Sequence, residues 1–438
     1  MKPLDVLLTC RSLTHRGGSE MYVRDLALGL ARHGQRPSVW CAETGPLADE
    51  LRRGGVSVIE RLDELAAPPD LVHAQQHLEL AVVLLRFPGT PAVFTCHAAR
   101  DAESEPLRWR AVRRCIAVDR ATRERLLAAG VPAAAVATEP NAVDLERFRP
   151  RPALPAAPRR ALVFSNYVHA REQLEVLRDV CAAAGLDLEI IGSESGHPHA
   201  APETALPAYD LVLAKGRCAL EAMAVGCAVV LCDATGVGPL VTTANLGELR
   251  RDNFGFRCLD RPLARAPLAA EISRYDPAEA ARVRDVVRDV AGVDGSIARL
   301  QAIYAAVLAE PADPDPHAGL AAAASEYLLR WAPFWRSAAR WQAVAEHAAE
   351  QRDRVEAARR LAAAELQRAL AIAQRVAEEA AAAELRAAQS ARAAGEARRE
   401  LLHAYATRTS KLRERILRLP GLLALYRRLR GRAAERVN

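Results

Sequence analysis

Residues 209–233 are YDLVLAKGRCALEAMAVGCAVVLCD, a stretch that predicts a strand, a tight turn, a helix and a second strand. The apolar run 211–213 is short and unbroken, which is typical of a parallel strand buried on both faces. Good helix formers fill 219–224, Gly226 ends that helix, and 228–231 resume a β-rich run. The stretch therefore predicts a βαβ unit of an open parallel sheet.

The turn of this unit carries Lys215, Gly216 and Arg217, and Glu221 follows within the helix. Ligands of open parallel sheets bind beyond the carboxyl ends of the strands, where the N–H groups of helix N-termini attract phosphate. Arg217 and Glu221 can share one helical face, which offers cations to a diphosphate and a carboxylate to ribose hydroxyls. The stretch thus predicts a nucleotide site. An intrahelical Arg217–Glu221 ion pair beside a solvated Lys215 explains the same spacing.

The composition indicates a globular chain with more than one domain. Its 438 residues, 50% of them hydrophobic, are enough for two or three domains. A net charge of +6 is modest for this length and gives no indication of nucleic-acid binding. The nine cysteines are an odd number without a CxxC pair, so we expect reduced core thiols rather than disulfides or metal ligands.

The chain shows no pattern of a secreted or membrane-spanning protein. Its first apolar run is interrupted by Asp5, and apolar segments such as 78–85 are shorter than the roughly 20 residues that span a bilayer. We expect a cytoplasmic protein, soluble or peripheral to the inner membrane.

The N-terminal region predicts the first βα unit of a nucleotide-type fold. A strand over 4–9 leads into a turn with Gly17 and Gly18, and a helix follows over 21–33. Glycine lets the backbone approach a ligand closely, although two glycines also suit any tight turn.

Strands and helices then alternate as in a parallel sheet, and His97 ends one of the strands. At the carboxyl end of a strand it would face the crevice as a general base or a contact for an acceptor hydroxyl, or it is simply hydrogen-bonded in a loop. The predicted elements are strands over 37–42, 56–59, 71–73, 93–97 and 115–118 and helices over 47–53 and 120–129.

A proline- and arginine-rich segment, RPRPALPAAPRR over 149–160, predicts a linker between two domains, 1–148 and 161–309. The second set begins with a strand over 161–165, a helix over 171–184 and a strand over 188–191. Gly236, Gly238 and Pro239 predict a flexible crevice loop after its last strand. The fold class is α/β, with two sheets facing each other across a cleft.

A different composition begins after a second proline-rich break. Residues 310–336 read as a linker with an aromatic segment (Trp331, Phe334 and Trp335, with Trp341 beyond it), and we expect these rings to pack against the globular body. Residues 337–438 predict a long helix, for which self-association as a coiled coil is the natural inference. Alanine-heavy seams are weak, so a partly frayed or intermolecularly packed helix is the alternative. From Arg408 on, the chain has ten Lys or Arg and only two acidic residues. This composition favours either binding to an anionic membrane surface or a solvated helix tip.

Four motifs give the chain a resemblance to a known family. They are GGSEMYVRDLALGLARHG at 17–34, CIAVDRATRERLLAAGVP at 115–132, PNAVDLERFRP at 140–150 and LEAMAVGCAVV at 220–230. In this order they resemble the family 4 glycosyltransferases, over about residues 4–310. The resemblance implies two Rossmann-like domains (GT-B), a nucleotide-diphosphate sugar bound by the second, an acceptor approached from the first, no metal ion or other cofactor, and retention of anomeric configuration.

Residue by residue, Gly17 and Gly18 match the family's glycine loop near the diphosphate and the acceptor. His97 matches its crevice histidine, and Glu221 matches its second glutamate, which contacts the ribose. The first glutamate would fall eight positions earlier, where this chain has Leu213.

The family's Arg and Lys pair after the first strand of the second domain is also missing. SNYVHAREQ offers only His169 and Arg171. We therefore expect Lys215 and Arg217, together with Arg171, to supply the charge that neutralises the diphosphate.

The resemblance predicts a glycosyltransferase that passes a sugar to a glycan or lipid-linked acceptor during assembly of a surface polysaccharide. Two alternatives stay open. An inactive scaffold that binds a nucleotide or partner fits Leu213, and a nucleotide-sugar epimerase would need no acceptor. Nucleic-acid binding is the weakest hypothesis, because the basic end has one Tyr and no Trp or Phe.

Overall fold

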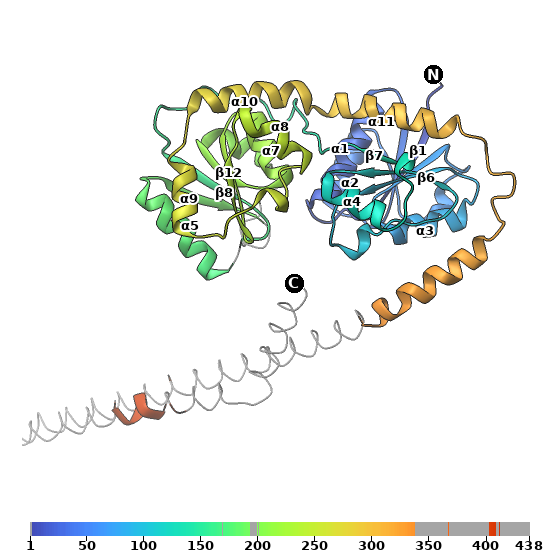
Figure 1. The fold of residues 1–438 in the computed structure, drawn as a ribbon. Helices are drawn as coiled ribbons and strands as arrows, with labels where there is room; N and C mark the ends of the chain where they lie inside the picture. The colour runs from blue at the N-terminus through green and yellow to red at the C-terminus, as the bar shows by residue number, and fades with distance from the viewer. Residues whose placement is uncertain are drawn as a thin grey trace, which may run out of the picture. The chain divides into compact units, whose positions relative to one another are not determined.

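A computed structural model describes residues 2–168, 170–192, 199, 201–337, 367, 403–408 and 411. The chain divides into two compact units, Met1–Leu328 and Leu329–Asn438. The first unit contains two α/β domains, each built around its own sheet (Figure 1). The predicted fold class is confirmed.

Seven parallel strands form the sheet of the first domain, in the order β3-β2-β1-β4-β5-β6-β7. This order, with β1 between β2 and β4, is that of doubly wound nucleotide-binding folds. The elements are β1 (Asp5–Ser12), α1 (Gly18–Arg32), β2 (Arg36–Glu43), α2 (Pro46–Arg53), β3 (Ser57–Ile59), β4 (Leu71–Ala74), α3 (His77–Arg86), β5 (Ala92–Cys96), β6 (Val112–Ala117), α4 (Arg120–Ala128) and β7 (Val136–Thr138).

Five strands form the sheet of the second domain, in the order β12-β11-β10-β8-β9, and only the β11–β12 pair is antiparallel. The elements are β8 (Arg160–Phe164), α5 (Arg171–Ala183), β9 (Asp187–Ile191), α6 (Pro202–Ala205), β10 (Leu211–Ala214), α7 (Gly216–Val225), β11 (Ala228–Asp233), β12 (Gly236–Leu240), α8 (Thr243–Arg251), α9 (Arg265–Ile272), α10 (Pro277–Val290) and α11 (Val293–Leu308).

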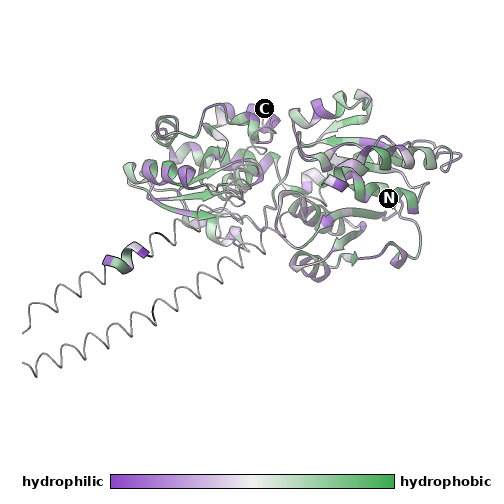
Figure 2. Ribbon diagram, turned by 90° about the horizontal axis from the view of Figure 1, so that it is seen from below, coloured by the Kyte–Doolittle hydropathy of each residue, from purple (hydrophilic) through white to green (hydrophobic). Residues whose placement is uncertain are grey.

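Burial explains why the central strands are so apolar. Every residue of β4, β5, β10 and β11 is buried, as expected where helices cover both faces of a parallel sheet. Hydrophobic residues accordingly follow the strands, and hydrophilic residues lie on the outward faces of the helices (Figure 2). Eight of the nine cysteines are also buried, as predicted for core thiols.

The last helix of the first unit, α11, packs with the first domain although it follows the second in sequence. Its residues Ile297, Leu300 and Val307 belong to the hydrophobic core beneath the first sheet. The predicted range of the second domain, 161–309, includes α11, although α11 packs with the first domain. The domain ranges 1–148 and 161–309 therefore stay predictions.

Two segments connect the domains, and they are hydrogen-bonded to each other. The N–H of Val143, on the way from β7 to β8, donates to the carbonyl of Ala291 at 2.8 Å. The N–H of Val293, the first residue of α11, donates to the carbonyl of Val143 at 3.1 Å. We call these two hydrogen-bonded segments, around Val143 and Ala291–Val293, the paired crossing.

The segment after α11 stays attached to the first domain. The Glu310 carboxylate accepts a bond of 2.6 Å from Arg114, and the Tyr327 hydroxyl lies 2.6 Å from Nδ1 of His77. The ring of Tyr327 also meets that of Trp109 edge to face, with centroids 6.0 Å apart. These contacts fix the start of the helix that continues over residues 320–337.

Two interpretations of the sequence are corrected here. The predicted loop at Gly236, Gly238 and Pro239 is the edge strand β12, where proline is tolerated and where added Cβ atoms would meet the carbonyls of Arg261 and Cys258 at 2.6 and 2.2 Å. The glycines therefore permit close backbone packing rather than flexibility. The apolar segment 78–85, not assigned to any element, lies in α3.

In the second unit, the rings of Trp331 and Phe334 meet edge to face at 5.7 Å. Trp341 and almost all of the proposed coiled coil and basic end lie outside the described residues. In the part of the chain that the structure describes, every helix is too short or too polar to traverse a bilayer.

A buried histidine links α11 to the first sheet and gives a pH-dependent prediction. His73 is fully buried between Tyr304 (2.5 Å) and Thr95 (2.7 Å), and burial, aided by nearby His97, lowers its pKa to about 3. The unfolded chain binds a proton here below about pH 6.5 and the folded chain does not, so stability falls as the pH falls. From about pH 7 to pH 5, the free energy of unfolding of wild type, measured with urea, should fall by about 2 kcal/mol more than that of His73→Gln. Parallel pH curves for the two proteins would contradict this assignment.

The start of α7 gives a second stability prediction. Gly216 has a φ of 57°, in the left-handed region, whereas Gly18 at the start of α1 does not. A Cβ meets open space at either position, so only the backbone distinguishes them. We expect Gly216→Ala to destabilise the chain by about 1 kcal/mol, and Gly18→Ala to be neutral or slightly stabilising. Thermal unfolding measures both, and equal effects of the two substitutions would count against the assigned backbone geometry.

Candidate active site

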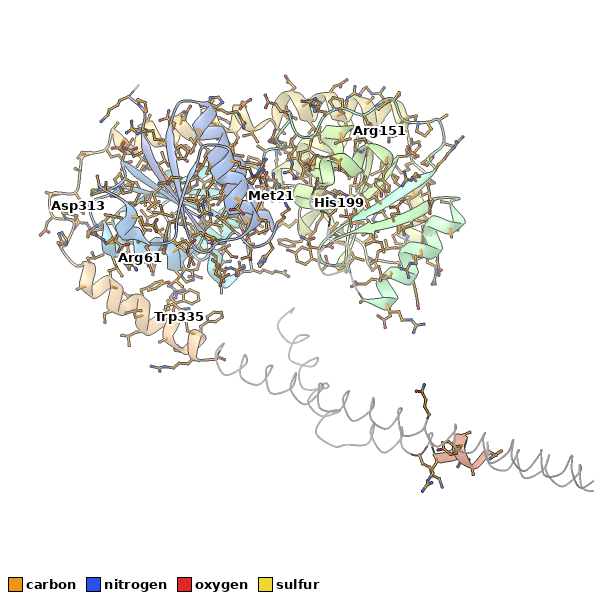
Figure 3. All side chains as sticks on the ribbon, turned by 180° about the vertical axis from the view of Figure 1, so that it is seen from behind. Met21, Arg61, Arg151, His199, Asp313 and Trp335 are labelled. Carbon is orange, nitrogen blue, oxygen red and sulfur yellow. The ribbon has the colours of Figure 1, made fainter. Side chains whose placement is uncertain are left out.

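A pocket of about 270 Å³ lies between the domains, at the carboxyl ends of their strands. Two of the residues predicted from the sequence line it, namely His97 from the first domain and Gly216 from the second. In Figure 3, α1, on which Met21 is labelled, lies on the side of the first domain that faces the second. The remaining lining residues are Ala98, Ala99, Arg100, Asp101, Asp119, Asn141, Asn253, Gly255 and Phe256.

His97 follows β5 directly, so the end of that strand presents it to the pocket. Its Nε2 lies 2.7 Å from Oε1 of Gln75 and donates to it, which leaves Nδ1 as an acceptor. The ring of Tyr22 meets it edge to face at 4.7 Å. Burial, together with the positive charge of Arg217, lowers the pKa of His97 to about 4. The imidazole is therefore neutral near pH 7, and its Nδ1 can accept a hydrogen bond from a hydroxyl group.

Lys215 occupies the turn between β10 and α7. Its ammonium pairs with the carboxylate of Asp233 at the end of β11 and lies 4.7 Å from the ring centroid of Tyr167. Asp233 also accepts a hydrogen bond of 2.7 Å from Ser165 at the end of β8. Three strand ends thus meet around this cation, which has a carboxylate partner rather than being merely solvated.

Arg217 exposes only 11% of its side chain and joins two carboxylates. Its Nε donates to Glu221 at 2.7 Å, so the intrahelical ion pair considered from the sequence is present. Its Nη2 donates to Asp25 of α1, in the other domain. Burial raises the pKa of Glu221 despite the neighbouring guanidinium. Burial would also raise the pKa of Asp25, but Arg217 and Arg24 hold it below its usual value.

A second guanidinium extends this network within the first domain. Arg24 bonds to Asp25 at 2.6 Å, to Glu50 of α2 at 2.7 Å and to Asp144 at 3.3 Å. Glu50 also accepts a bond of 2.8 Å from Arg16. Buried charges of this kind persist only when they are paired and hydrogen-bonded, and the cluster satisfies that requirement by joining four elements.

The loop after α8 closes the pocket from the second domain. Asn253 and Phe254 have φ values of 52° and 54°, which is unfavourable for residues other than glycine. Phe254 is fully buried, and its carbonyl accepts a bond of 2.7 Å from Gly216 N–H, so packing and hydrogen bonding hold this conformation. The ring of Phe256 lies 5.0 Å from the guanidinium of Arg100 in the first domain.

The structure places the other predicted residues as follows. Gly17 and Gly18 begin α1, which carries Asp25. Arg171 lies away from the pocket, with 88% of its side chain exposed and a 2.7 Å bond to Glu175. His169 lies outside the described residues. Leu213 is buried within β10. The helix α7 begins only two residues after that strand ends. The turn is too short to present a glutamate to the pocket at this position.

Several residues of the site were not predicted from the sequence, above all Asp25, Arg100, Asp119 and the loop 253–256. Asn141 belongs to the PNAVD motif, which contributed to the family resemblance but was given no functional role. Among the described residues, no three His, Cys, Asp or Glu side chains are grouped so that they could hold a metal ion.

Comparison with known proteins agrees with this geometry. The model of Glycosyltransferase Family 4 matches residues 16–147. The solved structure of HepE from Anabaena in complex with UDP aligns with a TM-score of 0.54 and 16% identity, covering 69% of this chain and all of that one. The HepE complex with UDP and glucose gives a TM-score of 0.50 at 16% identity, with 69% and 99% covered. No protein of curated function matches the sequence significantly.

The family match covers most of the first domain, and the structural likeness extends over both domains. The resemblance predicted from the sequence motifs is confirmed. Residues 16–147 thus match the model of Glycosyltransferase Family 4, and the two domains together have the GT-B fold.

Proposed function

We propose that the chain transfers a sugar from a nucleotide-diphosphate sugar to an acceptor hydroxyl in the interdomain pocket. The observation that carries this proposal is the meeting of a neutral His97 from the first domain with the N-terminus of α7 from the second. One side offers a hydrogen-bond acceptor to a hydroxyl, and the other offers N–H groups and cations to a leaving phosphate. HepE, which shares the fold, holds UDP.

The donor would bind with its diphosphate against the first turn of α7. Lys215 and Arg217 stand there, and free N–H groups at a helix N-terminus favour anions. Glu221, one turn later, would accept hydrogen bonds from ribose hydroxyls. Charge that develops on the departing nucleoside diphosphate would then be met by groups that are already oriented.

The acceptor would approach from the side of His97, with its hydroxyl directed at Nδ1. We propose a glycan or lipid-linked acceptor, transfer with retention of configuration, and a role in surface polysaccharide assembly on the cytoplasmic side of the inner membrane. The basic end of the chain would hold the protein at anionic lipid, and the preceding helix would allow self-association.

A non-catalytic scaffold is the second candidate, and one observation favours it. The cations of Lys215 and Arg217 are already paired with Asp233 and Asp25, and the turn leaves no position for the family's first glutamate. Product assays separate the candidates. Transfer requires donor and acceptor, an epimerase converts the donor alone, and a scaffold does neither.

Nucleotide binding tests the proposal directly. In calorimetric titrations of the full chain with UDP, GDP, ADP and dTDP, we expect one base to be preferred. Lys215→Ala should weaken its binding about tenfold, because a charge-assisted contact to phosphate is lost. Arg171→Ala, which also removes one positive charge but lies away from the pocket, should bind like wild type.

Thermal unfolding supplies an independent check, since a hundredfold excess over the dissociation constant stabilises the folded chain by about 2.7 kcal/mol. Failure of every nucleotide to bind would refute the proposed donor site. Equal losses in the two variants would refute its location at α7.

A further inference from the structure

The two cations at the start of α7 stand where a helix least favours them. Lys215 is the N-cap and Arg217 lies in the first turn, and that turn contains no acidic residue. The macrodipole makes a cation at this end of a helix unfavourable. Each is compensated by a carboxylate from outside the helix, namely Asp233 for Lys215 and Asp25 for Arg217.

These two carboxylates differ in origin. Asp233 ends β11 in the same domain as α7, whereas Asp25 belongs to α1 and is 192 residues away in sequence. The Arg217–Asp25 bond therefore connects the domains directly at the proposed donor site. Both side chains are almost fully buried, with 11% and 6% exposed, so the pair is little screened by solvent.

Each partner has a second partner of opposite charge. Arg217 keeps its 2.7 Å bond to Glu221 if Asp25 moves away. Asp25 keeps its 2.6 Å bond to Arg24, which is itself held by Glu50 and Asp144. Separation of Arg217 from Asp25 would thus leave neither charge buried and unpaired, the condition that normally makes breaking such a pair expensive.

We propose that Asp25 holds the position on Arg217 that a diphosphate of the donor takes, so that donor binding exchanges one anion for another. This inference rests on the proposed function and adds Asp25 as a positioning residue. A guanidinium donates to carboxylate and phosphate oxygens alike, so a phosphate oxygen can accept the bond that Nη2 now donates to Asp25. Because Asp25 belongs to the first domain, the exchange also releases α1 from α7.

The chemistry predicts selectivity for charge. A nucleoside carries no anion with which to displace Asp25, and its binding is independent of this contact. A nucleoside diphosphate competes with Asp25, and its measured affinity includes the free energy of breaking the Arg217–Asp25 bond.

The test is the affinity of Asp25→Asn for the nucleoside diphosphate that wild type prefers, measured by titration calorimetry on the full chain. Removal of the competing carboxylate should tighten binding about tenfold. Glu50→Gln is the matched control, because it removes one negative charge from the same cluster but has no contact with Arg217. Its affinity should stay within about twofold of wild type, and the corresponding nucleoside should not distinguish Asp25→Asn from wild type.

Unchanged or weaker diphosphate binding by Asp25→Asn overturns the proposal, and so does equal tightening by Glu50→Gln. If Asp25→Asn does not fold, the double variant Arg24→Gln/Asp25→Asn keeps the charge balance of the cluster and carries the same expectation. A wild-type chain that binds no nucleoside diphosphate refutes the proposed function itself. Normal wild-type binding with an unaltered Asp25→Asn affinity refutes only the exchange.

Discussion

A turn of one residue, Lys215, separates the end of β10 from the start of α7, and this short connection determines the geometry of the site. Because β10 lies in the middle of its sheet and is buried on both faces, its end can move little. The helix must therefore begin at the edge of the sheet, with Gly216 in a left-handed conformation and bonded to the loop after α8. That loop in turn adopts unfavourable backbone angles, which the buried ring of Phe254 holds in place.

Electrostatics follows from the same constraint. Two cations at a helix N-terminus need anions nearby, and the chain supplies them from the end of β11, from α7 itself and from the opposite domain. The result is a buried network in which the charges of the site also join the domains. Because most members have more than one partner of opposite charge, the network can lose a single contact without leaving a buried charge unpaired.

Much of the fold could be predicted from local pattern. The strand, turn, helix and strand of 209–233 lie within a few residues of their predicted bounds, because unbroken apolar runs and helix-ending glycines are local signals. His97 could be predicted at the crevice because it ends a strand. The edge strand β12 could not be, since its glycines matter through contacts with Cys258 and Arg261, and neither could the partnership of Asp25 with Arg217, which depends on how two helices far apart in sequence face each other.

The paired crossing at Val143 and Ala291–Val293 has a mechanical consequence. A single connecting strand would let one domain swivel freely about the other. Two segments joined side by side by hydrogen bonds restrain such a rotation more than one segment would. In the proposed reaction, this restraint would reduce the orientational entropy that a donor and an acceptor held by separate domains lose when they meet.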